Sequence, residues 1–189
     1  MGLTQRLDVL VSATRSSAWP EKAVLLLVGD GAARSELAEL AKQSPEGRVR
    51  LLPYQPRSEL AQSLSAADLH VVSMHERITG CLCPSKLYGI LAAGRPVLAI
   101  ADNATDLCET VRKHDVGWCC PIGDAETIAR AVELAANDQG LDELGKRARD
   151  VALSEFDRSV VTQKFADLLH ELCSVTNDHN TDASELAAT

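Results

Sequence analysis

The segment PSKLYGILAAGRPVLAI, which runs from Pro84 to Ile100, decides the fold of this chain. Its first part has helical spacing, because apolar residues recur at steps of three and four positions. The proline and serine at its start are typical of the beginning and the cap of a helix, and Gly94 followed by Pro96 is typical of a helix end. The apolar run up to Ile100 is too short for another helix, so it predicts a buried strand.

The first turn of this helix is a candidate phosphate site. Backbone N–H groups at a helix N-terminus lack partners within the helix and carry the positive end of its dipole, and Lys86 adds a full charge beside them. The residues predicted to contact an anionic ligand here are Gly80, Pro84, Ser85, Lys86 and Leu87. The alternative interpretation is a capped core helix whose lysine is merely solvated.

The remaining sequence alternates between strand and helix patterns. Strands are predicted at 23–28, 49–52, 69–72, 96–100 and 117–120. Helices are predicted at 7–14, 33–42, 58–65 and 104–113, and in two or three pieces from 125 to about 173. This order predicts an α/β fold with a doubly wound, mostly parallel, Rossmann-like sheet and C-terminal helices. The domain is expected over 1–173, and the aperiodic segment 174–189 is expected to be a disordered tail.

Two further loops follow predicted strands and belong to the candidate site. Ligands of doubly wound sheets bind outside the carboxyl ends of the strands. Gly29 and Gly31 permit a tight turn and the close approach of a ligand, and Tyr54 offers an aromatic face or backbone groups to a base. Both loops could instead be plain structural turns.

Composition excludes several classes of function. The 189 residues are 46% hydrophobic and only 3% aromatic, which predicts an aliphatic core, and the net charge of −8 argues against binding to nucleic acid or to an anionic membrane surface. No stretch is long and apolar enough to span a membrane, and no signal peptide pattern is present, so a cytoplasmic protein is expected.

No metal centre or nucleophilic triad is predicted. The six cysteines lack the spacing of a zinc site, and reduced, mostly buried thiols are expected. His70 and His114 are interpreted as ordinary polar residues at the ends of elements. The catalytic residues are left unassigned, and no cofactor is expected.

The segment from Pro84 to Val97 resembles a signature of the donor-binding half of GT-B retaining glycosyltransferases, in the branch that builds cell-surface polysaccharides and exopolysaccharides. The resemblance runs from about Gly2 to about Leu172 and includes the Val28–Gly31 turn, the Ala66-Ala67-Asp68 segment before a strand, and the strand from Gly117 to Pro121. It implies a nucleoside diphosphate sugar as donor, with UDP preferred, and a lipid-linked or saccharide acceptor. A place in the cytoplasm, peripheral to the inner membrane face, is also implied.

The sequence departs from the family pattern at several positions. Gly89 and Cys81 stand where relatives place glutamates, one of which binds the ribose hydroxyls, so Glu109 is considered as a substitute. A basic residue that relatives place after the first strand would lie before or around Met1.

The resemblance also implies that a first strand and a whole acceptor domain are missing before the first helix. That strand would lie between the strands predicted at 23–28 and 69–72. Three outcomes are considered: the two strands close on each other, the chain associates with another chain through their edges, or the domain is only marginally stable. Association or low solubility is expected. The implied partners are a nucleotide sugar and a separate acceptor domain or subunit. The alternative function is a non-catalytic nucleotide-binding module or a truncated relic.

Overall fold

The computed structural model of the chain describes residues 5–75 and 84–185. The chain consists of two compact units, Met1–Asp150 and Val151–Thr189. The division falls earlier than the boundary at 173 that the sequence pattern suggests.

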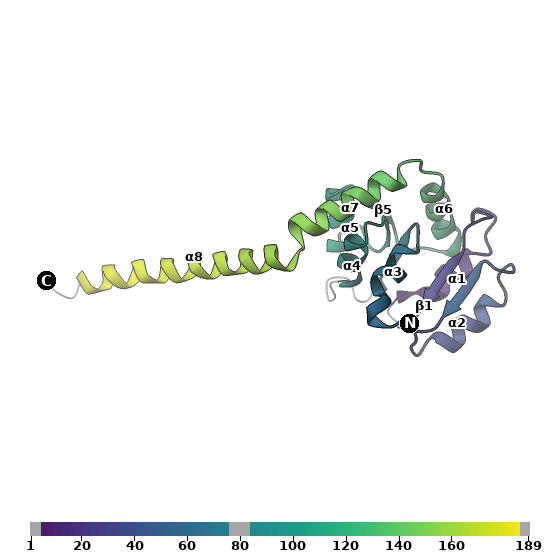
Figure 1. Cartoon of the computed structure of the whole chain (residues 1–189), viewed down its shortest axis with the longest axis horizontal. Helices are drawn as coiled ribbons and strands as arrows, with labels where there is room; N and C mark the ends of the chain where they lie inside the picture. The colour runs from purple at the N-terminus through teal and green to yellow at the C-terminus, as the bar shows by residue number, and fades with distance from the viewer. Residues whose placement is uncertain (1–4, 76–83, 186–189) are drawn as a thin grey trace. The chain divides into compact units, whose positions relative to one another are not determined.

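The first unit confirms the predicted alternation of strands and helices (Figure 1). Its strands are β1 (Leu25–Val28), β2 (Val49–Leu52), β3 (His70–Ser73), β4 (Val97–Ile100) and β5 (Gly117–Cys120). Its helices are α1 (Leu7–Ala13), α2 (Arg34–Ala41), η2 (Arg57–Glu59), α3 (Leu60–Ser65), α4 (Lys86–Ala92), α5 (Asp106–Lys113), α6 (Ala125–Ala136) and the larger part of α7 (Leu141–Glu155). The bounds agree with the predicted ones to within about two residues, as expected for signals read from local patterns.

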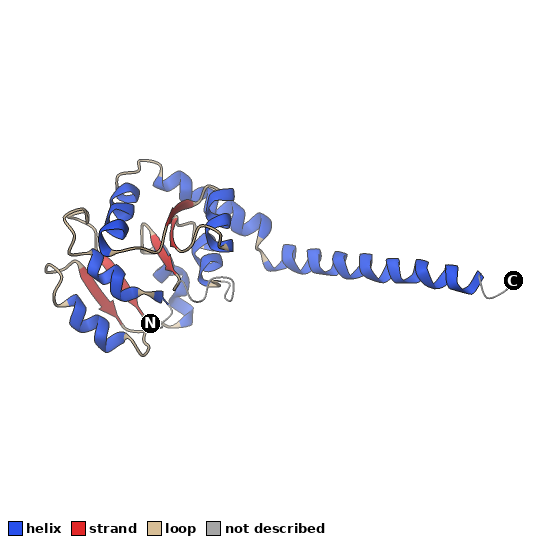
Figure 2. Ribbon diagram, turned by 180° about the vertical axis from the view of Figure 1, so that it is seen from behind, coloured by secondary structure: helices blue, strands red, loops and turns tan. Residues whose placement is uncertain are grey.

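Every strand pair in the described part of the chain is parallel, as predicted. β1 pairs with β2, with Val28 beside Leu52, and β3, β4 and β5 form a second group in that order. Helices flank the strands on both sides in Figure 2. The fold is therefore the doubly wound α/β fold that the sequence predicts, but its strands form two sheets instead of one.

The division between the sheets falls where the resemblance places an additional strand. Among the described strands, β1 pairs only with β2 and β3 pairs only with β4, so β1 and β3 do not close on each other. Of the three alternatives that the sequence leaves open, direct closure of these strands is therefore ruled out. Leu26 and Val28 on β1 remain substantially exposed. Association through these strand edges stays a prediction.

A single aliphatic core joins the two sheets. Leu10 and Val11 of α1 belong to the same buried cluster as Leu25 of β1 and Leu98 of β4. α1 packs against both α2 and α6, so its side chains link the parts of the unit that strand pairing does not. All four residues of β4 are buried, which is typical of a parallel strand covered on both faces.

The ends of α4 agree only in part with the sequence prediction. Ser85 has helical dihedral angles and its side chain accepts no capping hydrogen bond, so the predicted serine cap is wrong. The C-terminus is as expected. Gly94 takes a positive φ of 66°, its N–H donates to the Leu91 carbonyl, and the Arg95 N–H donates to the Ile90 carbonyl. This pair of bonds is a Schellman motif, which needs a left-handed residue and therefore favours glycine.

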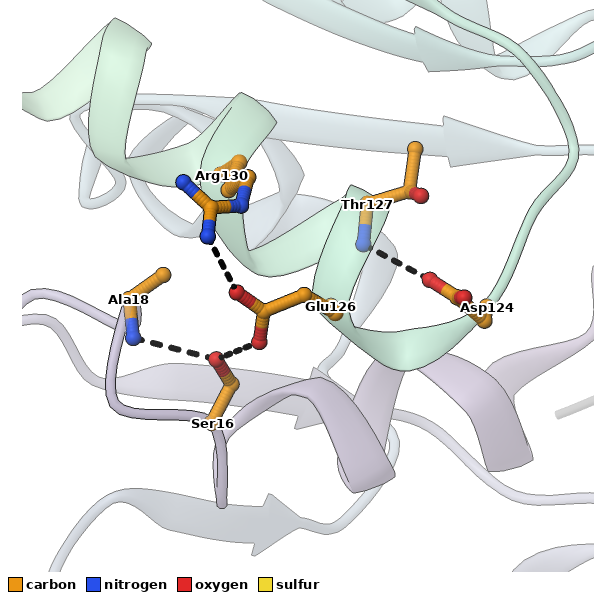
Figure 3. Close-up of polar contacts among 6 residues, drawn as sticks. All are labelled: Ser16, Ala18, Asp124, Glu126, Thr127 and Arg130. Atoms are coloured by element: carbon orange, nitrogen blue, oxygen red, sulfur yellow. Dashed lines mark hydrogen bonds and ion pairs between the residues drawn. The ribbon is translucent and has the colours of Figure 1, made fainter.

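The beginning of α6 is fixed by side chains and tied to the end of α1 (Figure 3). The Thr127 N–H donates to the Asp124 carboxylate over 2.8 Å, and this bond holds the pKa of Asp124 below its usual value. Glu126 accepts a hydrogen bond from the Ser16 hydroxyl and pairs with Arg130 at 3.0 Å. These contacts support the packing of α1 on α6.

The second unit contains the last residues of α7 and the helix α8 (Arg158–Glu185). Figure 1 shows α8 as one continuous helix. It continues through residues 174–185, where the sequence pattern suggests a disordered tail. Once a helix has nucleated, each further residue adds one backbone hydrogen bond, so a helix can extend into a segment without an apolar pattern.

Candidate functional site

The loops after β1 and β2 both lie at the carboxyl end of their sheet, because the two strands are parallel and in register. Gly29 and Gly31 have φ angles of 118° and 146°, which side-chain-bearing residues rarely adopt. The Gly29 N–H donates to the Leu52 carbonyl over 3.1 Å, which joins the ends of the two strands. Tyr54 follows two residues later and is 76% exposed. The structure thus brings together three of the predicted site residues, Gly29, Gly31 and Tyr54.

Arg34, which sequence reasoning missed, ties these two loops together. Its Nη1 donates to the Gly29 carbonyl over 2.7 Å and to the Leu52 carbonyl over 3.3 Å. Arg34 is the first residue of α2, where the helix dipole disfavours a cation. The two carbonyl acceptors compensate for that placement. The sequence feature that could have indicated this role of Arg34 is an arginine at the start of a helix that follows a glycine turn.

The second group of predicted residues lies at the start of α4. Pro84 is half-buried, and Ser85 and Lys86 are exposed. Leu87 differs from them, because its side chain is buried in the core and its N–H donates to the Pro84 carbonyl over 2.9 Å. Of this group, Lys86 therefore offers a charged group to a ligand in solution. Gly80 lies outside the described residues.

The two groups belong to different sheets. The first follows β1 and β2, while the second precedes α4, which packs against β3. No hydrogen bond or ion pair between described residues joins Gly29, Gly31 or Tyr54 to residues 84–87. A ligand that contacts both groups would have to bridge the two sheets.

Two other positions concern the ribose contact that the family pattern implies. Glu109 lies exposed in the first turn of α5, which begins after the carboxyl end of β4, and Thr105 caps that helix by accepting from the Cys108 N–H. Gly89 lies within α4, where an added Cβ would contact only Cδ1 of Leu64 at 3.5 Å. Glu109 thus remains available as a carboxylate near a strand end.

The described residues also form a pocket of about 410 Å³ near the amino ends of the strands in the second sheet. Asp68 precedes β3 and Pro96 precedes β4, so the pocket adjoins the amino ends of these strands. Its lining comprises Asp68, Gly94, Arg95, Pro96, Leu141, Asp142, Gly145, Lys146 and Arg149. None of the predicted ligand contacts lines it.

The described cysteines are thiols without metal-binding geometry. Cys108 and Cys120 are buried, Cys119 is half-buried and Cys173 is exposed, while Cys81 and Cys83 lie outside the described residues. Burial, followed by the hydrogen bond with Cys108, raises the pKa of Cys119 to about 12, so its reactive thiolate is disfavoured. No group of three or more His, Cys, Asp and Glu side chains within 5–75 and 84–174 could hold a metal ion.

None of the helices in the described part of the chain combines the length and the apolar character needed to cross a membrane.

Comparisons with known proteins agree with this fold. The family described as "Glycosyl transferases group 1" matches residues 3–138, which include all five strands and both candidate loop groups. The chain is 29% identical over 154 residues to a Pseudomonas aeruginosa protein described as "Probable glycosyltransferase WbjE", with 82% of this chain and 38% of the relative covered. It is 31% identical over 148 residues to the lipopolysaccharide core biosynthesis glycosyltransferase LpsE of Rhizobium meliloti, with 77% and 41% covered.

A solved structure shows the same fold. The sucrose-phosphate synthase of Thermosynechococcus elongatus superposes with a TM-score of 0.73 at 26% identity, over 92% of this chain and 44% of that protein. The chain spans about two fifths of the length of the two curated relatives.

Proposed function

The chain belongs to the group 1 glycosyltransferase family, and we propose that it is the half of such an enzyme that binds the nucleotide-sugar donor. The donor would be a nucleoside diphosphate sugar, with UDP as the preferred nucleotide. The acceptor would be a lipid-linked or saccharide molecule in the synthesis of surface polysaccharides, which is in line with the similarity to LpsE, a glycosyltransferase of lipopolysaccharide core biosynthesis. The reaction would take place in the cytoplasm, at or near the inner face of the membrane.

The family match over all five strands carries this proposal, and the loops at the carboxyl ends of the strands support it. Gly29, Gly31 and Tyr54 follow the ends of two paired strands and can approach a base or a ribose closely. Arg34 joins these strand ends through the carbonyls of Gly29 and Leu52. Lys86 can neutralise charge on a diphosphate. Because the diphosphate is the leaving group in sugar transfer, a cation beside it would stabilise the charge that develops there.

A second candidate function is a nucleotide-binding module that transfers no sugar by itself. The observation in its favour is the length of the match, since the curated relatives are more than twice as long as the segment they share with this chain. The two functions share the donor site and differ in whether a bound nucleotide sugar is consumed.

Lys86→Ala is expected to weaken the binding of UDP by roughly tenfold, equivalent to about 1.5 kcal/mol for one charge-assisted contact at an exposed position. The stability of the fold should not change, because the Lys86 side chain is exposed. Isothermal titration calorimetry measures the affinity, and thermal unfolding checks the fold.

Lys42→Ala is the matched control for this experiment. Lys42 is an exposed lysine that follows α2, and among the described residues its ion pair is with Glu39 of the same helix. It lies between the end of α2 and the amino end of β2, whereas the candidate loops follow the carboxyl ends of β1 and β2. Its removal should therefore leave the affinity for UDP unchanged. Equal affinities of the wild type and the Lys86 variant would place the diphosphate elsewhere.

The chain purified by itself is expected to bind a nucleoside diphosphate and to leave a UDP-sugar intact in the presence of saccharide acceptors. The physical reason is that transfer needs the acceptor held against the donor, and the chain corresponds to only two fifths of its relatives. Release of UDP, followed by chromatography, measures turnover. Sustained release that depends on the acceptor would rule out the purely binding module.

A further inference from the structure

The Arg34 side chain fixes one peptide group in each of the two loops that follow β1 and β2. Its Nη1 donates to the Gly29 carbonyl over 2.7 Å and to the Leu52 carbonyl over 3.3 Å. The first of these oxygens belongs to the first peptide group of the glycine turn, and the second belongs to the peptide group that leads to Pro53. Because a peptide group is planar, a bond to its oxygen limits the direction in which the chain continues. Arg34 therefore sets the position of the glycine turn relative to the segment that carries Tyr54.

The pairing of β1 with β2 is complete without Arg34. Four pairs of residues form the parallel ladder, and the Gly29 N–H donates to the Leu52 carbonyl over 3.1 Å at its end. The Gly29 carbonyl lies beyond this ladder. No described atom lies within 4 Å of the place that a Cβ on Gly29 would take, so packing on that side does not hold the turn. The bond from Arg34 therefore holds the turn where strand pairing has already ended.

The position of Arg34 limits what it contributes to the stability of the fold. It is the first residue of α2, and the positive end of the helix dipole disfavours a cation there. Among the described residues, no carboxylate forms an ion pair with it. Its side chain is half-buried, so part of its hydration is lost as well. The benefit of this arginine is therefore expected in the arrangement of the loops.

From this geometry we propose that Arg34 is a positioning residue for the nucleoside part of the donor, an inference that rests on the proposed function. Its two bonds hold the glycine turn and the Tyr54 segment in place before a ligand arrives, so binding does not have to order them. Lys86 precedes a helix that packs against the other sheet and would serve the diphosphate. The two side chains should therefore affect different parts of the same ligand.

Ligands of two sizes test this division. Arg34→Met removes the donors and keeps a long side chain that favours helix. Titration of the full chain with uridine and with UDP, followed by amide shifts in two-dimensional NMR spectra, measures both affinities. Arg34→Met should weaken both ligands by the same factor, roughly twofold to tenfold, since the loops must then be ordered on binding. Lys86→Ala should weaken UDP and leave uridine unchanged. A loss in Arg34→Met that is confined to UDP would overturn the proposal, because it would place Arg34 at the diphosphate.

Arg48→Met is the matched control. Arg48 is also half-buried, and its Nη1 donates to the Thr14 carbonyl over 2.8 Å. This bond has the same chemistry and lies at the amino end of β2, opposite the candidate loops. Arg48→Met should leave both affinities unchanged, whatever stability it costs. Arg34→Lys keeps a cationic donor and should regain part of the lost affinity. Thermal unfolding confirms that each variant is folded at the temperature of the titrations.

Amide hydrogen exchange reports the loops without a ligand. The Gly29 N–H should exchange faster in Arg34→Met than in the wild type and in Arg48→Met, because the end of the ladder loses its second bond. Unchanged exchange, unchanged uridine affinity in Arg34→Met, or equal losses of affinity in the two methionine variants would each overturn the role of Arg34. A wild type that binds neither uridine nor UDP would contradict the proposed function and this role together. A wild type that binds both as tightly as Arg34→Met does would contradict this role alone.

Discussion

Gly117→Ala is expected to destabilise the first unit by more than about 4 kcal/mol, which approaches the whole stability of a small domain. Gly117 begins β5 beside Val97 of β4, with a φ of 153°. A Cβ at this position would lie 1.9 Å from the Val97 carbonyl oxygen and 2.7 Å from its nitrogen. Both atoms belong to the backbone of a fully buried strand, so neither can move aside without breaking the pairing of β4 with β5. Urea denaturation measures the effect.

Two other glycines separate the steric cost from the conformational cost. Gly47 has a φ of 81° with no atom near its missing Cβ, so Gly47→Ala should cost only about 1–2 kcal/mol for the left-handed conformation. Gly89 lies inside α4 with a single contact at 3.5 Å, and Gly89→Ala should stabilise the unit by up to about 1 kcal/mol through helix propensity. Comparable losses for Gly117→Ala and Gly47→Ala would show that β5 does not lie as closely against Val97 as described.

The second large effect is expected for Leu10→Ala, which should cost about 3–5 kcal/mol, as typical of a leucine deleted from a tightly packed core. Leu10 is 2% exposed and lies in the cluster that includes Leu25 of β1 and Leu98 of β4. Since no strand pairing among the described residues joins the two sheets, the apolar side chains of α1 help to hold them in one core. A cavity at this position therefore weakens both sheets at once.

Leu134→Ala serves as the control for this variant. Leu134 is on α6 and is 62% exposed, so its truncation removes few contacts and should change the free energy of unfolding by less than about 0.5 kcal/mol. Equilibrium denaturation followed by circular dichroism and by tryptophan fluorescence measures both. A loss for Leu10→Ala as small as that for the control would show that α1 does not carry the packing between the sheets.

Local patterns in the sequence determined the elements of this protein. The short apolar run from Val97 to Ile100 predicts the buried strand β4, and the glycine before Pro96 predicts the end of α4, because both depend on residues a few positions apart. The order of strands and helices also predicts the parallel, doubly wound arrangement, since it limits how neighbouring elements connect.

Contacts between distant residues were decided only by the tertiary structure. The division into two sheets depends on which strands pair. Arg34 joins two loops because it donates to the carbonyl of Leu52, which lies 18 positions further along the chain. Ser85 does not cap α4 because its own backbone is already helical. The need for glycine at 117 arises from Val97, twenty positions earlier, so no pattern around Gly117 reveals it. Such contacts depend on register and packing between segments that only the folded chain brings together.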